Sequence, residues 1–178
     1  MLKAIMELAE KDDKLMLITG DLGFGLFEEF QERYPHKYIN TGIAEQNMIG
    51  VATGLALEGM TVFVYSIGNF PTFRCLDQIR NGLCYHDLNV NIISMGAGFS
   101  YGVLGTTHHA TEDISVIRAL PNIDVYSPIT ELDAYDVINS VYEIDHPSYI
   151  RLDKSTIIHS EAVTKFSHMV SQFKVGKD

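Results

Sequence analysis

Residues 15–25 read LMLITGDLGFG, and this stretch decides the fold class. The apolar run at residues 15–18 is short and continuous, which is typical of a strand buried on both faces of a parallel sheet. Gly20 and Asp21 end the run as turn residues, and a helical pattern over residues 27–34 follows. The stretch therefore predicts one β/α unit.

The same alternation continues along the chain. The pattern predicts strands at residues 15–18, 37–40, 61–65, 90–94, 123–126 and 148–151. It predicts helices at residues 3–11, 27–34, 45–57, 73–84, 113–119 and 131–142. We therefore expect a three-layer α/β/α domain with a mostly parallel, doubly wound sheet of about six strands.

The length of 178 residues suits one substantial domain but is too short for a large multidomain enzyme. We expect this domain to cover residues 1–155. The pattern becomes irregular after Lys154, so residues 156–178 are expected to form a linker toward a C-terminal domain that this sequence lacks.

The net charge of −10 repels phosphate backbones and anionic lipid, so neither nucleic acid nor a membrane is an expected partner. No apolar run approaches the ~20 residues that span a bilayer, and the N-terminus lacks the pattern of a signal peptide. Cys75 and Cys84 show neither C-x-x-C spacing nor a disulfide-dense setting. We expect a cytoplasmic protein with two structural thiols.

Four stretches could carry chemistry, and the first is Gly20–Gly25. Its order is G-x-x-G-x-G rather than the G-x-G-x-x-G of dinucleotide-binding turns, so it is a weak nucleotide motif. A tight turn in which Asp21 caps the next helix is the favoured interpretation. An independent dinucleotide-binding domain remains an alternative.

The second stretch, NTGIAEQNM at residues 40–48, opens a nearly apolar helix. Gly50 and Gly54 stand one turn apart, so this helix is expected to pack against another backbone from its first turns. Glu45 would then be poorly solvated. It is either a carboxylate stabilised by the helix N-terminus or a desolvated carboxyl that shares a proton with a ligand nitrogen.

The third and fourth stretches offer rings and histidines. Phe70 and Phe73 flank a strand-to-helix junction and could form an apolar wall for a flat heterocycle, although core packing is commoner. His108 and His109 follow a glycine-rich loop and could donate protons, or could belong to a polar loop and helix cap. No further ligand stands at a metal-binding spacing, so no metal is expected on this chain.

Taken in order, five motifs resemble the pyrimidine-binding domain of the thiamine-diphosphate-dependent transketolase family, over about the first 155 residues. The motifs are GDLGFG, NTGIAEQNMIGVATGLALEG, FPTF followed by DQIRN, GxxGTTHHATEDI and ALPNIDVYSP. The likeness is greatest to transketolase-like proteins that are encoded as separate N-terminal and C-terminal subunits. It implies ketol-unit transfer or related C–C bond chemistry.

The resemblance also implies roles for single residues. Glu45 matches the glutamate that bonds the N1′ nitrogen of the cofactor's aminopyrimidine. Phe73, or with less support Phe70, matches the ring that stacks on the pyrimidine. Asp21 falls where an acid lies near the cofactor site.

On the substrate side, His108 matches a loop histidine that faces substrate, with His109 as its neighbour. Arg151 matches an arginine that holds the substrate phosphate. Leu104 stands where ordinary transketolases have an aspartate, and residues 94–98 lack a histidine that another phosphate contact would need. Sugar-phosphate specificity is therefore not expected to carry over.

No G-D-G motif followed by the usual Asn is present, so the half that binds diphosphate and Mg²⁺ is expected on a partner. The resemblance thus implies thiamine diphosphate shared with a diphosphate-binding N-terminal subunit, and a homodimer or higher oligomer. The isolated chain would be inactive. The alternative is a non-catalytic assembly or regulatory domain of the same fold.

Overall fold

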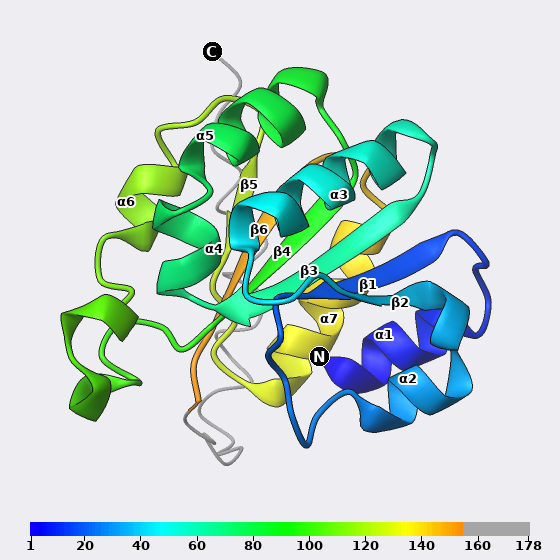
Figure 1. The fold of residues 1–178 in the computed structure, drawn as a ribbon, viewed down its shortest axis with the longest axis horizontal. Helices are drawn as coiled ribbons and strands as arrows, with labels where there is room; N and C mark the ends of the chain where they lie inside the picture. The colour runs from blue at the N-terminus through cyan, green and yellow to red at the C-terminus, as the bar shows by residue number, and fades with distance from the viewer. Residues whose placement is uncertain (155–178) are drawn as a thin grey trace.

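The computed structural model describes residues 1–154 and contains a six-stranded sheet in the order β2-β1-β3-β4-β6-β5 (Figure 1). The strands are β1 (Leu15–Thr19), β2 (Tyr38–Asn40), β3 (Thr61–Ile67), β4 (Val90–Met95), β5 (Asp124–Tyr126) and β6 (Ser148–Leu152). Every neighbouring pair is parallel. The expected fold class is confirmed.

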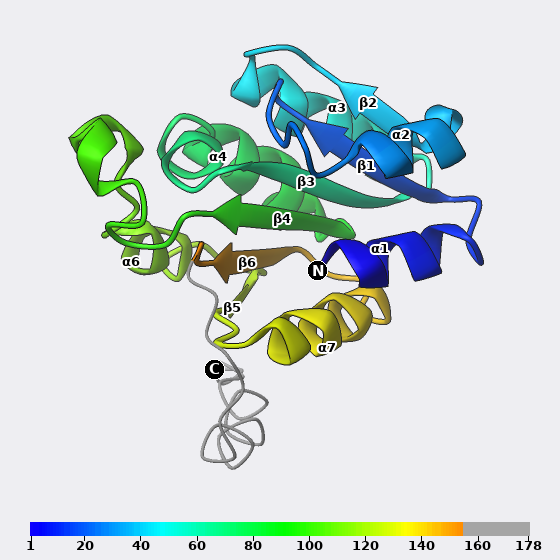
Figure 2. The same ribbon diagram turned by 90° about the horizontal axis from the view of Figure 1, so that it is seen from below.

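Helices cover both faces of the sheet (Figure 2). One face carries α1 (Leu2–Ala9), α2 (Glu28–Arg33) and α7 (Glu131–Tyr142). The other carries α3 (Glu45–Leu57), α4 (Asn69–Phe73), α5 (Leu76–Gln78) and α6 (Asp113–Ile117). Alternate strand residues enter the two cores: Leu17 packs on the first face and Ile18 on the second. Burial on both faces explains the continuous apolar runs of the strands.

The strand order places the loops of interest at one edge. The chain passes from β1 outward to β2 and then returns past β1 to β3, so the order reverses between β1 and β3. In open parallel sheets, ligands bind outside the carboxyl ends of the strands at such a reversal. The loops that follow β1, β2, β3 and β4 all lie at this edge.

The prediction of a single helix over residues 73–84 is wrong. The structure has α4, then α5, then a π-helical segment over Ile79–Cys84. The π-helical segment packs closely on α3, since a Cβ at Gly82 would stand 2.7 Å from the Thr53 hydroxyl oxygen. The π-helical turn sets Gly82 against α3 while Ile79 and Cys84 remain buried.

Helix α3 has the predicted bounds, but its glycines do not pack as expected. Gly50 and Gly54 are exposed, and apart from the neighbouring backbone of α3 itself no described atom lies within 4 Å of a Cβ built at either position. Within residues 1–154, the close approach to α3 is therefore made by Gly82 on Thr53.

Two further results concern single side chains. Lys37 is buried, with 3% of its surface exposed, and its ammonium donates to the Ala9 carbonyl at the end of α1 (2.7 Å) and to the Asp12 carbonyl (3.0 Å). Cys75 and Cys84 are free and buried.

The expected linker, residues 156–178, lies outside the described residues. No helix within the described part of the chain has the length and apolar character needed to cross a bilayer.

Candidate active site

Glu45 is the first residue of α3, and the turn before it is held by Asn40. The Asn40 side-chain oxygen accepts from the amides of Asp21 (3.0 Å) and Gly42 (2.9 Å). Gly42 has a φ of +72°, which a glycine adopts at little cost. Glu45 is 5% exposed, and its Oε2 lies 3.2 Å from Nη1 of Arg74. A buried carboxylate at the carboxyl edge of the sheet is therefore paired with an arginine from the segment after α4.

Arg74 also covers the ring of Phe70. Its guanidinium carbon lies 4.0 Å from the ring centroid, a cation–π contact. Phe70 and Arg74 are four residues apart on helical backbone, which places them on one face. Phe73 makes none of the ring contacts found among residues 1–154. The planar guanidinium thus touches a carboxylate and an aromatic face together.

His108 joins this group from the loop after β4. Its ring centroid lies 5.1 Å from that of Phe70, and its Nδ1 lies 3.0 Å from the Thr107 hydroxyl. His109 instead packs on the exposed ring of Phe99, at 4.9 Å between centroids. Of the two predicted histidines, His108 is therefore the one on the Phe70 side.

Asp21 lies beside the same turn. Its Oδ1 accepts from the side-chain nitrogen Nδ2 of Asn40 at 3.0 Å. The neighbouring Gly20 faces Glu45, since a Cβ there would lie 3.8 Å from the Glu45 Cγ. The interpretation that Asp21 caps the next helix is wrong, because α2 begins only at Glu28 and Asp21 is bonded to Asn40 instead.

Arg151, at the end of β6, points inward. Its Nε donates to Oδ2 of Asp113 (2.9 Å) and its Nη2 to the carbonyl of Ala110 (3.1 Å). The predicted role in holding a phosphate stays a prediction. Two of the arginine's donor groups are, however, engaged with the protein.

A cavity at this edge of the described residues is lined by other side chains than those of the Glu45 group. It encloses about 530 Å³, and its lining includes Leu22, Phe24, Tyr65 and Tyr101. Burial raises the pKa of Tyr65 to about 12, so its phenol stays protonated. None of the predicted site residues lines this cavity.

Cys75 follows Arg74 in the chain, and its thiol donates to the Phe70 carbonyl at 3.7 Å. Burial, and next the nearby charge of Glu45, raise the pKa of this thiol to about 12. The thiol is therefore neutral and unreactive at physiological pH, as expected of a structural cysteine. Among residues 1–154, no cluster of three or more His, Cys, Asp or Glu side chains is arranged as a metal site.

Sequence reasoning missed Arg74, Asp113 and Tyr149 as site residues. The first two lie inside stretches that were singled out, but nothing in their spacing distinguishes them from surface charges. Tyr149 lies within a predicted strand, where an aromatic residue is expected to be a core residue. The partners of these side chains are distant in sequence, so only the fold reveals them.

Fold and site together define a class: a doubly wound α/β domain with a buried carboxylate, an aromatic ring and a loop histidine at its carboxyl edge. Residues 1–158 match the family model described as the transketolase pyrimidine-binding domain. The chain belongs to this family.

Relatives agree with the family assignment. The chain is 37% identical over 153 residues to the "Putative transketolase C-terminal section" of Methanocaldococcus jannaschii, covering 85% of this chain and 48% of the relative. It is 31% identical over 154 residues to one subunit of the apulose-4-phosphate transketolase of Phocaeicola vulgatus, covering 86% and 49%. This chain therefore spans about half the length of these curated relatives.

A solved structure shares the fold. It is described as "Split gene transketolase, inactive beta4 tetramer" and superposes with a TM-score of 0.79 at 34% identity. The match covers 89% of this chain and 51% of the solved chain.

Proposed function

We propose that this chain supplies the pyrimidine end of a thiamine diphosphate site in a transketolase-like enzyme. One observation carries the proposal: the Arg74 guanidinium stands over the Phe70 ring, with its carbon 4.0 Å from the ring centroid, and its Nη1 lies 3.2 Å from the buried carboxylate of Glu45. A guanidinium is a planar group that offers N–H donors at its edge. An aminopyrimidine protonated on a ring nitrogen presents the same two features, so the residues present fit this part of the cofactor.

Each residue then has a defined task. Glu45 holds a proton at the ring nitrogen, because burial at 5% exposure shields this proton from water. Phe70 supports the face of the ring, and the turn fixed by Asn40 and Asp21 sets the position of Glu45. His108, beside Phe70, donates or accepts a proton at the substrate. Thiamine diphosphate, when bound, supplies the carbon nucleophile for ketol-unit transfer or related C–C bond chemistry.

The remaining half of the site is proposed to come from a diphosphate-binding N-terminal subunit that also holds Mg²⁺. The names of the relatives, one a C-terminal section and the other a single transketolase subunit, support a split enzyme. Large apolar side chains are exposed in the loops at the same edge, among them Phe24 (79%), Ile43 (79%) and Phe99 (70%). Such exposed side chains suit a partner surface.

Self-association of the chain alone is part of the same proposal. The related solved structure is described as an inactive β4 tetramer, which favours an inactive homo-oligomer when the partner is missing. We place the complex in the cytoplasm, where two free buried thiols fit a reducing compartment.

The test is turnover in a complex reconstituted with the diphosphate-binding subunit. Glu45→Gln keeps the size of the side chain but removes the acid, and it should lower kcat at least ~100-fold. Glu58→Gln, just beyond the other end of α3 and exposed, is the matched control and should leave kcat unchanged. An active complex in which Glu45→Gln turns over as fast as Glu58→Gln would support the alternative, a non-catalytic domain of the same fold.

A further inference from the structure

We propose that Asp113 and Arg151 are positioning residues, which hold the His108 loop against α4 and so fix His108 beside Phe70. The catalytic meaning of this inference rests on the proposed function. The positioning itself can be measured without any reaction.

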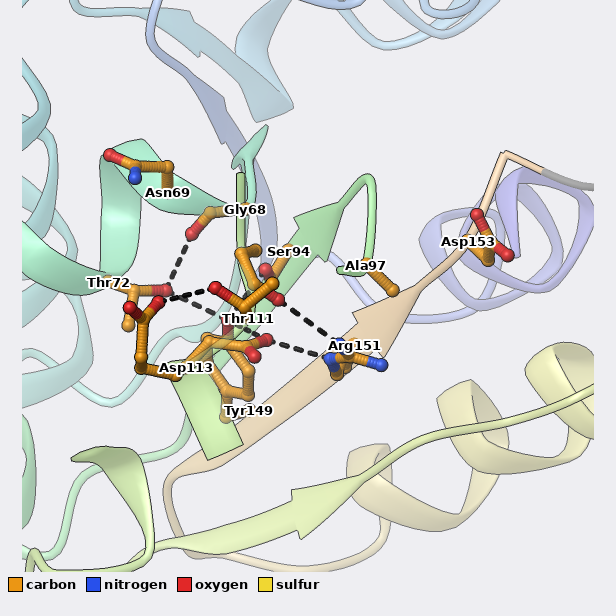
Figure 3. Close-up of polar contacts among 12 residues, drawn as sticks. Gly68, Asn69, Thr72, Ser94, Ala97, Thr111, Asp113, Tyr149, Arg151 and Asp153 are labelled. Carbon is orange, nitrogen blue, oxygen red and sulfur yellow. Dashed lines mark hydrogen bonds and ion pairs between the residues drawn. The ribbon is translucent and has the colours of Figure 1, made fainter. Parts of the chain in front are cut away.

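Asp113 is the centre of a buried polar network (Figure 3). It is the first residue of α6 and is fully buried. Its Oδ2 accepts from Nε of Arg151 (2.9 Å) and from the hydroxyl of Tyr149 (3.1 Å). Burial, and next the charge of Asp113, raise the pKa of Tyr149, so its phenol keeps the proton that it donates. Three side chains from α6 and β6 are thus joined inside the protein.

The network extends directly to the loop that carries His108. Nη2 of Arg151 donates to the Ala110 carbonyl at 3.1 Å. Ala110 also forms an antiparallel bridge with Gly98, with amide-to-carbonyl distances of 2.8 and 2.9 Å. From the other side, Asn69 donates to the His109 carbonyl at 2.9 Å. The backbone just after His108 is therefore held by β6 on one side and by α4 on the other.

The same network also holds α4. The Tyr149 hydroxyl lies 2.8 Å from the Thr72 hydroxyl and 2.7 Å from that of Ser94. Because Tyr149 donates to Asp113, the single Thr72 hydroxyl proton goes either to the Tyr149 hydroxyl, which links α4 to the network, or to the Gly68 carbonyl (2.6 Å) at the start of α4. Since α4 carries Phe70 and the loop carries His108, one network sets the 5.1 Å separation of their rings.

The cost of the network argues for a role beyond stability. The second carboxylate oxygen of Asp113, Oδ1, is buried without a hydrogen-bond partner among the described residues. Burying an unpaired acceptor and a charged pair is unfavourable compared with well-packed apolar side chains. The arrangement does, however, provide fixed geometry at a place where two site elements meet.

This assignment and the phosphate-binding prediction for Arg151 lead to different kinetics. A phosphate contact would show in the KM of a phosphorylated substrate. A positioning role should instead lower kcat, because small displacements of a catalytic group cost up to ~100-fold. In the reconstituted complex, Asp113→Asn should lower kcat about 10- to 100-fold and leave KM within about threefold.

Hydrogen exchange on the full chain measures the positioning directly. Asp113→Asn should speed exchange of the Gly98 and Ala110 amides at least ~10-fold relative to the amide of Phe63 in β3. The matched control is Asp133→Asn, which removes another buried carboxylate from the first turn of a helix, in the capping box of α7 with Thr130. It should loosen α7 while leaving kcat and the Gly98 and Ala110 amides unchanged.

If Asp113→Asn does not fold, Tyr149→Phe removes one hydroxyl of the network and keeps the ring, and the same exchange pattern is expected. Unchanged protection of Gly98 and Ala110, or a raised KM with unchanged kcat, would overturn the inference. A wild-type complex without turnover would contradict the proposed function, and the exchange result would still decide the positioning.

Discussion

Replacing Phe70 with leucine should weaken binding of thiamine diphosphate, whereas the same change at Phe73 should have little effect. The reason is geometric. Phe70 contacts Arg74 on its face and His108 at 5.1 Å, so a ring held against Phe70 lies within reach of Glu45 and of the loop. Phe73 makes no such contact among the described residues.

Phe70→Leu has two effects whose size can be estimated: the first is on cofactor binding and the second on thermal stability. Stacking of a heterocyclic base on an aromatic side chain contributes about 1–3 kcal/mol. Loss of that contact corresponds to about 5- to 150-fold weaker binding. Phe70→Leu also loses the cation–π contact, about 0.5–1 kcal/mol, and the ring pair with His108, about 0.5–1.5 kcal/mol. Together they predict a fall in Tm of roughly 2–10 °C.

Calorimetric titration of the reconstituted complex with thiamine diphosphate measures the first effect, and thermal melts of the chain measure the second. Leucine is chosen in both variants because it keeps most of the apolar volume, so a binding difference reports the ring. Weaker binding in Phe73→Leu than in Phe70→Leu would refute the reasoning and restore Phe73 as the stacking residue.

Three further outcomes can be checked on the chain itself. Lys37→Met should lower the free energy of unfolding by about 1–3 kcal/mol in urea titrations, because the buried carbonyl of Ala9 loses its donor, and an unchanged midpoint would contradict this. Gly68→Ala should lower the free energy of unfolding by about 1–3 kcal/mol in the same titrations, since the new Cβ would stand 2.9 Å from that of Ala110. Gly54→Ala, with open space around it, should raise the free energy of unfolding by about 0.5–1 kcal/mol. The pKa of the Cys75 thiol rises from 9.0 to about 12 on folding, so its stabilising contribution is complete below about pH 9 and is lost as the pH rises toward 12. Between about pH 8 and pH 11, the urea midpoint of Cys75→Ala should therefore fall less steeply with pH than that of the wild type. Equal slopes of midpoint against pH in the two proteins would contradict the raised pKa of the Cys75 thiol.

Much of the fold could be predicted because it depends on short-range patterns. Helices α3 and α7 have the predicted bounds, and α7 also starts at a capping box made by Thr130 and Asp133. The parallel strands were recognisable from continuous apolar runs. These features depend on residues that are neighbours in sequence.

The buried polar groups could not be predicted in this way. A lysine is normally exposed, so nothing in the sequence suggested that Lys37 would be enclosed by the end of α1, 28 residues away. Asp113 and Arg151 are 38 residues apart, and Tyr149 meets Thr72 across 77 residues. Such partners become visible only when the strand order is known.

The start of α4 bears on the choice between Phe70 and Phe73, which stays a prediction. A helix that begins at Phe73 leaves Phe70 outside any regular element and gives it no defined neighbour. The structure instead forms α4 over Asn69–Phe73 and keeps Arg74 in helical conformation. Phe70 and Arg74 then stand four residues apart on one helix face, so the guanidinium is placed over the ring and within 3.2 Å of Glu45. The early start of α4 therefore brings the carboxylate, the cation and the ring together as one candidate site.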